Sequence, residues 1–251
     1  MDEKLKNTIK KAIPIFLLIL SICFLEWILS LIAKDSSVFV FWGTSSNEGA
    51  INLANISVRS SANFNWTFIT LFAIVIYIYF SELKNKNYKG LMAALALYGV
   101  HWIYEILNAL IQSISGYALW TVSPESTSFI LLIGVSWELS MMFAIAGLAM
   151  SKLLPENTNL EILGMNNRIF FAILNAAFFS FFEIFLAGTP AFLWIYPWWG
   201  AIPVFITTYI PFFLAAFLIY DAPIKKQVKF ISILWGVVLL LLATLIPLGI
   251  I

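Results

Sequence analysis

The sequence has very few of the groups on which metal sites and soluble enzymes depend. Its 251 residues include one cysteine, Cys23, and one histidine, His101, and only 11% of the residues are charged. A lone cysteine excludes an intrachain disulfide, and one histidine is too few for a zinc site of nitrogen and sulfur ligands. We find no phosphate loop, nucleotide fingerprint or nucleophile elbow, and no basic patch large enough for nucleic acid. We therefore expect no metal, no cofactor and no nucleic-acid partner.

Apolar side chains are abundant instead. The chain is 62% hydrophobic with a mean hydropathy of +0.95, whereas a soluble domain is about half apolar and about one quarter charged. A hydrocarbon core about 30 Å thick requires about 20 apolar residues in a helix. We expect one all-α membrane domain with an outer loop at 34–64. Its seven transmembrane helices are expected at 12–33, 66–80, 91–114, 128–153, 169–187, 201–220 and 230–251.

The basic residues predict how this bundle lies in the membrane. With a cytoplasmic N-terminus and seven spans, twelve of the fourteen Lys and Arg residues fall in inner segments, and only Lys34 and Arg59 fall outside. Cytoplasmic segments are enriched in these residues, so we expect the C-terminus outside. Tryptophans near the outer surface are typical of a belt at the lipid headgroups. We expect four such residues: Trp120, Trp194, Trp198 and Trp199.

Ionisable side chains inside the apolar segments are the strongest functional signal. Each costs at least a few kcal/mol in a bilayer and by default marks a functional site. At about 1.5 Å per residue, the four carboxyls lie roughly 21 Å from the inner ends of their spans. We therefore expect one shared cavity in the outer half of the membrane. The five residues are Glu26, His101, Glu105, Glu138 and Glu183.

The spacing of these residues suggests acid–base chemistry. His101 and Glu105 are four residues apart and share one helix face, which Asn108 continues. Burial disfavours the charged form of a carboxyl, and a protonated carboxyl can donate a proton. We assign catalytic roles to His101, Glu105, Glu138 and Glu183. We assign substrate binding to Glu26, Trp102, Asn108, Trp137 and Phe182. Any one of these polar groups could also be a hydrogen bond that packs two helices together.

The third predicted span contains Gly99-Val100-His101-Trp102-Ile103-Tyr104-Glu105, which resembles the motif of the emopamil-binding family of sterol isomerases. That family has a histidine and a glutamate four residues apart on one helix and another glutamate on the next, where Glu138 stands here. The sixth span, Tyr196 to Asp221, is similarly rich in aromatic residues and proline and ends in aspartate. This sequence departs from the family's pattern in two respects. The family has five spans rather than seven, and we expect Glu138 in mid-helix rather than at the start of a helix.

The resemblance implies a mechanism. A protonated carboxyl donates to a carbon–carbon double bond of a flat lipid, and aromatic faces, with Trp102 as a candidate, stabilise the cation. A second carboxylate or the imidazole then removes a proton elsewhere, which moves the double bond. The resemblance makes Glu105 and Glu138 the acid–base pair, with His101 orienting or relaying.

Three hypotheses follow from the sequence. The first is a lipid-modifying enzyme, an isomerase or cyclase acting on a sterol-like or isoprenoid lipid. The second is a proton-coupled transporter, because carboxyl and histidine chains also build proton relays, and the sixth span is interrupted by Gly200, Pro203 and Pro211. The third is a lipid-binding membrane protein without catalysis. In each case the partner is a membrane lipid or a hydrophobic small molecule.

Overall fold

The computed structural model describes residues 40–43 and 48–251, so the predicted span 12–33 and Glu26 lie outside the described residues. The described chain is mostly helical, as expected, with short paired strands near the two ends of the bundle. The helices are α2 (Glu48–Ser57), α3 (Thr67–Lys84), α4 (Tyr88–Ser115), α5 (Trp137–Ser151), α6 (Asn167–Ala187), α7 (Ala201–Val204), α8 (Ile210–Asp221) and α9 (Ile224–Leu245). The strands are β1 (Trp120–Val122), β2 (Ile130–Leu132), β3 (Val135–Ser136), β4 (Glu161–Ile162), β5 (Met165–Asn166) and β6 (Phe192–Trp194).

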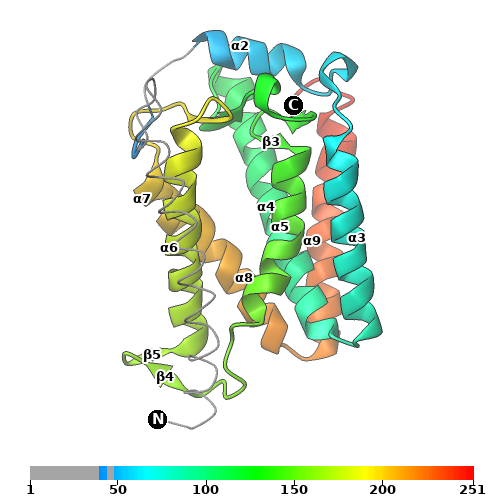
Figure 1. Ribbon diagram of the computed structural model, residues 1–251, viewed down its shortest axis with the longest axis vertical. Helices are drawn as coiled ribbons and strands as arrows, with labels where there is room; N and C mark the ends of the chain where they lie inside the picture. Colours follow the sequence, from blue (N-terminus) through cyan, green and yellow to red (C-terminus); the bar gives the residue numbers. More distant parts are fainter. Residues whose placement is uncertain (1–39, 44–47) are drawn as a thin grey trace.

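The helix α4 is the centre of the bundle. It packs against α3, α5, α8 and α9, and α6 packs against α8 on the other side of the molecule. Figure 1 shows the long helices running along one axis, with α2 at one end and the β4–β5 hairpin at the other. The antiparallel pair β1–β6, in which Trp120 lies opposite Trp194, joins the chain after α4 to the chain after α6.

Five helical segments of the described chain are long and apolar enough to cross a membrane: α3, α4, α6, the continuous segment Ala201–Asp221, and α9. They correspond to five of the seven predicted spans, although α9 begins earlier than expected, at Ile224. The segment Ala201–Asp221 stays helical across both of its prolines. Pro203 lies in the first turn of α7, where a proline is tolerated, and Pro211 follows a single π-helical turn, Phe205–Tyr209, that lies between α7 and α8.

The prediction of one long helix at 128–153 was wrong. This region forms the β2–β3 hairpin and then α5, which has only 15 residues. β-Branched residues around Gly134 favour strands and a tight turn, and the side chain of Ser136 caps α5 by accepting from the backbone N–H of Leu139. Glu138 therefore lies in the first turn of a helix rather than in its middle. The expected loop at 34–64 likewise contains a helix, α2.

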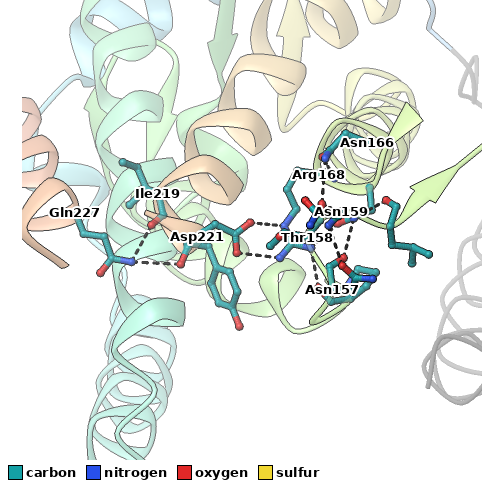
Figure 2. Close-up of polar contacts among 12 residues, drawn as sticks. Asn157, Thr158, Asn159, Asn166, Arg168, Ile219, Asp221 and Gln227 are labelled. Carbon is teal, nitrogen blue, oxygen red and sulfur yellow. Dashed lines mark hydrogen bonds and ion pairs between the residues drawn. The ribbon is translucent and has the colours of Figure 1, made fainter. Parts of the chain in front are cut away.

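Polar contacts tie the helices together at the end of the bundle that carries β4 and β5. Figure 2 shows the guanidinium of Arg168, at the start of α6, facing the carboxylate of Asp221, at the end of α8. Two hydrogen bonds join them, Nε to Oδ2 at 2.5 Å and Nη2 to Oδ1 at 2.9 Å. Gln227 of α9 donates to the carbonyl of Ile219 at 2.8 Å, so α6, α8 and α9 are fixed at one level. Seven exposed lysines lie at this end: Lys84, Lys86, Lys89, Lys152, Lys225, Lys226 and Lys229.

Candidate functional site

A cavity of about 250 Å³ lies between α4, α5, α6 and the α7–α8 segment, with β1 and β6 beside it. Aromatic and aliphatic side chains form most of its wall, and a few polar groups from separate helices enter it. The polar side chains are His101, Glu105, Glu183, Thr208 and Tyr209. The aromatic side chains are Trp120, Phe143, Phe178, Phe179, Phe182, Phe192 and Phe212.

His101 and Glu105 enter the cavity from α4. Their exposed fractions are 1% and 4%, and His101 Nε2 lies 3.3 Å from Glu105 Oε1. The indole N–H of Trp120, on β1, donates to the same oxygen at 3.3 Å. The imidazole stacks on Phe143 of α5 with ring centroids 4.1 Å apart, which fixes its orientation. The Trp120 indole therefore donates to Glu105 Oε1, and the imidazole of His101 lies beside the same oxygen.

Glu183 enters from α6 on the opposite side of the cavity. It is 9% exposed, and the Tyr209 hydroxyl of the π turn is its hydrogen-bond partner. The indole of Trp194, on β6, faces the same carboxyl. Glu183 and Glu105 are close enough to interact electrostatically. The two carboxyls thus face one space from two helices that are far apart in the sequence.

The π turn places Thr208 and Tyr209 in the cavity. Pro211 has no N–H, so it cannot donate to the carbonyl of Thr207, four residues earlier. The Tyr104 hydroxyl of α4 donates to that carbonyl instead, at 2.6 Å. π-Helical turns inside α-helices occur frequently at functional sites, and here the turn is held against the helix that carries His101 and Glu105.

Several buried polar atoms of the cavity have no hydrogen-bond partner in the described chain. They are both imidazole nitrogens of His101, Glu105 Oε2, Glu183 Oε2 and Thr208 Oγ1. Buried polar atoms of native proteins are normally hydrogen-bonded, so each such group requires an explanation. All these side chains line one cavity, which is the arrangement of a ligand site with a few convergent polar groups in an apolar wall.

The structure brings four of the sequence-predicted site residues to the cavity wall: His101, Glu105, Phe182 and Glu183. Glu138 is not among the lining residues. Its Oε1 accepts a hydrogen bond from the backbone N–H of Ser128 at 2.7 Å, at the start of α5. Leu139 faces the cavity, and the next residue along a helix points about 100° away. We expected Glu138 to share one cavity with the other carboxyls, but it does not line this cavity, because residue depth does not fix the rotation of a helix.

The predicted substrate-binding residues on α4 and α5 also point elsewhere. Asn108 is fully buried, but its Oδ1 accepts from the backbone N–H of Leu119 at 2.7 Å and its Nδ2 donates to the carbonyl of Trp120 at 2.9 Å, so it anchors β1. Trp102 packs in the apolar cluster between α4 and α9. Trp137 stacks on Phe68 of α3 with centroids 5.1 Å apart.

Sequence reasoning missed several residues of the site, including Trp120, Phe143, Thr208 and Tyr209. Trp120, Trp194 and Trp199 are buried rather than in a belt at the membrane surface, and Trp198 alone of the four is exposed, at 59%. Trp120 lies on β1 and Trp194 on β6, and Trp120 lines the cavity. The pair of prolines that flank Thr208 and Tyr209 was the available signal, because a proline frees backbone groups that a functional turn can use.

These features define a multi-pass membrane protein with an internal cavity lined by carboxyl groups. Residues 48–247 match the model of the family described as "Uncharacterized membrane protein family", and the chain belongs to that family. It is also similar to a protein from Archaeoglobus fulgidus, described as "Uncharacterized protein", with 42% identity over 186 residues, which covers 73% of this chain and 88% of the relative. No solved structure matches the chain. The family and the long apolar helices make it an integral, multi-pass membrane protein.

Proposed function

We propose that this protein is a membrane-embedded enzyme that moves a double bond in an isoprenoid or sterol-like lipid by acid–base chemistry in the cavity. The observation that carries the proposal is the pair Glu105 and Glu183. Each presents an unpartnered, buried carboxyl oxygen, and both line the same aromatic cavity. Two such groups can add a proton at one position of a substrate and remove a proton at another.

The surroundings of the two carboxyls assign their roles. Glu105 accepts from the Trp120 indole and lies 3.3 Å from His101 Nε2, and in this proposal it acts as the base. Glu183, in an aromatic wall and next to another carboxyl, is the acid. His101 lies beside the Glu105 carboxyl, where it can orient this group or relay a proton.

The reaction balances without another reactant. The Glu183 carboxyl transfers its proton to one carbon of the double bond, and a positive charge develops on the other carbon. Glu105 removes a proton from the adjacent carbon, and the released electron pair forms the new double bond. Glu183 ends as carboxylate and Glu105 as acid, and one proton exchange between them restores the starting state. Aromatic faces such as those of Phe143, Phe179 and Phe212 stabilise the cation.

The size of the cavity limits the substrate. Its volume, about 250 Å³, lies below the roughly 300–1,000 Å³ of pockets that hold a whole drug-sized molecule. The site therefore takes the reacting end of a lipid or a small isoprenoid. Six of the lining residues are half-buried, and all of them are apolar side chains of α5 and α6: Leu139, Met142, Phe178, Phe179, Phe182 and Leu186. This apolar wall suits a substrate that arrives from lipid.

The resemblance of the His101–Glu105 segment to the emopamil-binding family supports the same chemistry, although Glu138 does not line the cavity. The position of Glu138 in the first turn of α5 also agrees better with that family than the mid-helix position we expected. The proposal replaces Glu138 by Glu183 as the partner of Glu105.

We also infer the orientation of the bundle. The end that carries seven exposed lysines and the β4–β5 hairpin is the cytoplasmic end, because cytoplasmic segments are enriched in Lys and Arg. The end with α2 and the β1–β6 pair then lies outside. With the predicted span at 12–33, the N-terminus is cytoplasmic and the C-terminus is outside.

Proton-coupled transport has less support. A transporter requires a polar path that continues from the cavity toward the inner end. The polar side chain that the sequence offers there is Asn175, and its amide donates to the carbonyl of Phe171, one turn earlier in its own helix, at 2.8 Å. Asn175 is therefore already used in local packing.

The test compares lipid extracts of cells that express the protein or its variants. Glu105→Gln and Glu183→Gln preserve size but remove the proton-transfer group, and we expect each to reduce product at least about a hundredfold. Glu138→Gln is the matched variant, because its carboxyl lies outside the cavity and an amide oxygen can still accept from Ser128; it should keep the activity. The proposal is wrong if extracts from wild-type cells equal those from empty vector, or if both cavity variants remain active. A protein that binds lipid without turnover would give the first result.

A further inference from the structure

Thr208 has a free hydroxyl in the wall of the cavity. The side chain is 7% exposed, it lines the cavity, and its Oγ1 has no hydrogen-bond partner in the described chain. Thr208 takes no part in the proton transfers proposed for Glu105 and Glu183. Its hydroxyl therefore needs an explanation of its own.

Other hydroxyl side chains in the membrane helices show what is usual in this fold. A helical threonine commonly donates to the carbonyl four residues earlier. Thr207 does so to Pro203 at 2.7 Å, and Thr244 to Leu240 at 2.8 Å. Ser180 donates across helices to the carbonyl of Ala201 at 2.7 Å. Thr208 makes no such bond, although it follows Thr207 directly in the chain.

The π turn accounts for this difference. It rotates Thr208 toward the cavity, and the adjacent Tyr209 is the partner of Glu183. A hydroxyl is both a donor and an acceptor, so Thr208 can bond the oxygen of an alcohol or of a carbonyl. The carboxyls Glu105 and Glu183 share the cavity and disfavour a phosphate or carboxylate there.

We propose that the ligand of this cavity carries one neutral oxygen, a hydroxyl or a carbonyl, and that Thr208 binds it. This inference rests on the proposed function, because it names the substrate class as an oxygenated isoprenoid rather than a hydrocarbon. An apolar ligand would leave the buried Thr208 hydroxyl without a hydrogen bond. For this reason, sites with buried polar groups reject analogues that lack the matching group. Thr208 is thus a specificity residue of the site.

The test measures binding of two small probes to the purified protein in detergent. One is geraniol, a prenyl alcohol; the other is the hydrocarbon in which its hydroxyl is replaced by hydrogen. Quenching of tryptophan fluorescence reports binding, since Trp120 lines the cavity. The measured quantity is the ratio of the two affinities in each variant, so that partition into micelles affects all variants alike.

We expect the wild-type protein to prefer the alcohol. Thr208→Val keeps the shape and removes the hydroxyl, and it should reduce that preference about three- to tenfold, the value of one net hydrogen bond. Thr207→Val is the matched control, because the Thr207 hydroxyl bonds its own helix, and the preference should stay. Thr208→Ser should also keep it. Thr208→Ser preserves the hydroxyl. If Thr208→Val does not fold, the comparison of Thr208→Ser with Thr208→Ala provides the same test.

Two results would overturn the inference. One is a preference for the alcohol that persists when residue 208 has no hydroxyl. The other is equal binding, or no binding, of the two probes by the wild-type protein, which would mean that Thr208 recognises no oxygen of this class. Neither result depends on turnover. A lipid extract without product, together with a preference that requires Thr208, would reject the enzyme and leave the binding site.

Discussion

Gly134, in the turn between β2 and β3, lies directly against the carboxyl of Glu105. An ideal Cβ on Gly134 would stand 2.7 Å from Glu105 Oε2 and 2.4 Å from the indole nitrogen of Trp120. Those contacts are too short for any side chain, so the absence of a Cβ allows the hairpin to close over the cavity. The backbone of the β2–β3 turn thus limits the space around Glu105 Oε2, an oxygen of the proposed base.

The first prediction concerns this contact. Gly134→Ala places a Cβ against the Glu105 carboxyl, the Trp120 indole and the Asn108 amide, which must shift. Overpacking of this kind costs about 1–3 kcal/mol of unfolding free energy. The matched control is Gly236→Ala in α9, where no atom lies within 4 Å of the added Cβ. Alanine is the better helix former by up to about 1 kcal/mol, so that variant should be equally or more stable. Thermal unfolding in detergent measures both, and equal midpoints for the two variants would contradict the prediction.

The second prediction compares two buried asparagines. Asn108 holds the start of β1 through bonds to the backbone of Leu119 and Trp120, whereas Asn175 bonds only within its own helix. Asn108→Ala leaves backbone groups of β1 unpaired and should cost about 2–3 kcal/mol. Asn175→Ala should cost less than about 1 kcal/mol. The measurement is the unfolding midpoint of each variant. A loss at Asn175 that equals the loss at Asn108 would mean that β1 is not held in this way.

The third prediction concerns the pair at the proposed cytoplasmic end. Arg168 binds both carboxylate oxygens of Asp221 and joins α6 to α8. Asp221→Asn keeps the shape but removes the charge and one of the two acceptors, and we expect a loss of about 1–3 kcal/mol. Arg168→Lys should be similarly unfavourable, because an ammonium group cannot make the two parallel bonds.

The control for the ion pair is Lys225→Gln. Lys225 is exposed on the first turn of α9, and exposed substitutions usually change stability by less than about 0.5 kcal/mol. Heating in detergent followed by size-exclusion chromatography gives the fraction that remains folded. The interpretation fails if Asp221→Asn survives as well as Lys225→Gln does.

The sequence located most of the fold because a membrane span depends on local composition. Runs of about 20 apolar residues are required by the thickness of the bilayer, and α3, α4, α6 and α9 could be read from the chain on that basis. Among the described residues the misjudged span is 128–153, which is mostly apolar despite Glu138 and Lys152, so hydropathy alone could not distinguish a hairpin and a short helix from one long helix. The turn at Gly134 and the cap at Ser136 were the local signals that divide it.

The sequence by itself determined which groups share a face of one helix. His101 and Glu105 face the same side because residues four apart in an α-helix always do. Tertiary structure decided which groups from other elements meet them, because the rotation of a helix about its axis depends on its packing. That rotation brings Glu183 to Glu105 and leaves Glu138 outside, although the chain places both at similar depth. Tertiary structure also formed the β1–β6 pair and placed the π turn, and these bring Trp120, Thr208 and Tyr209 to the cavity.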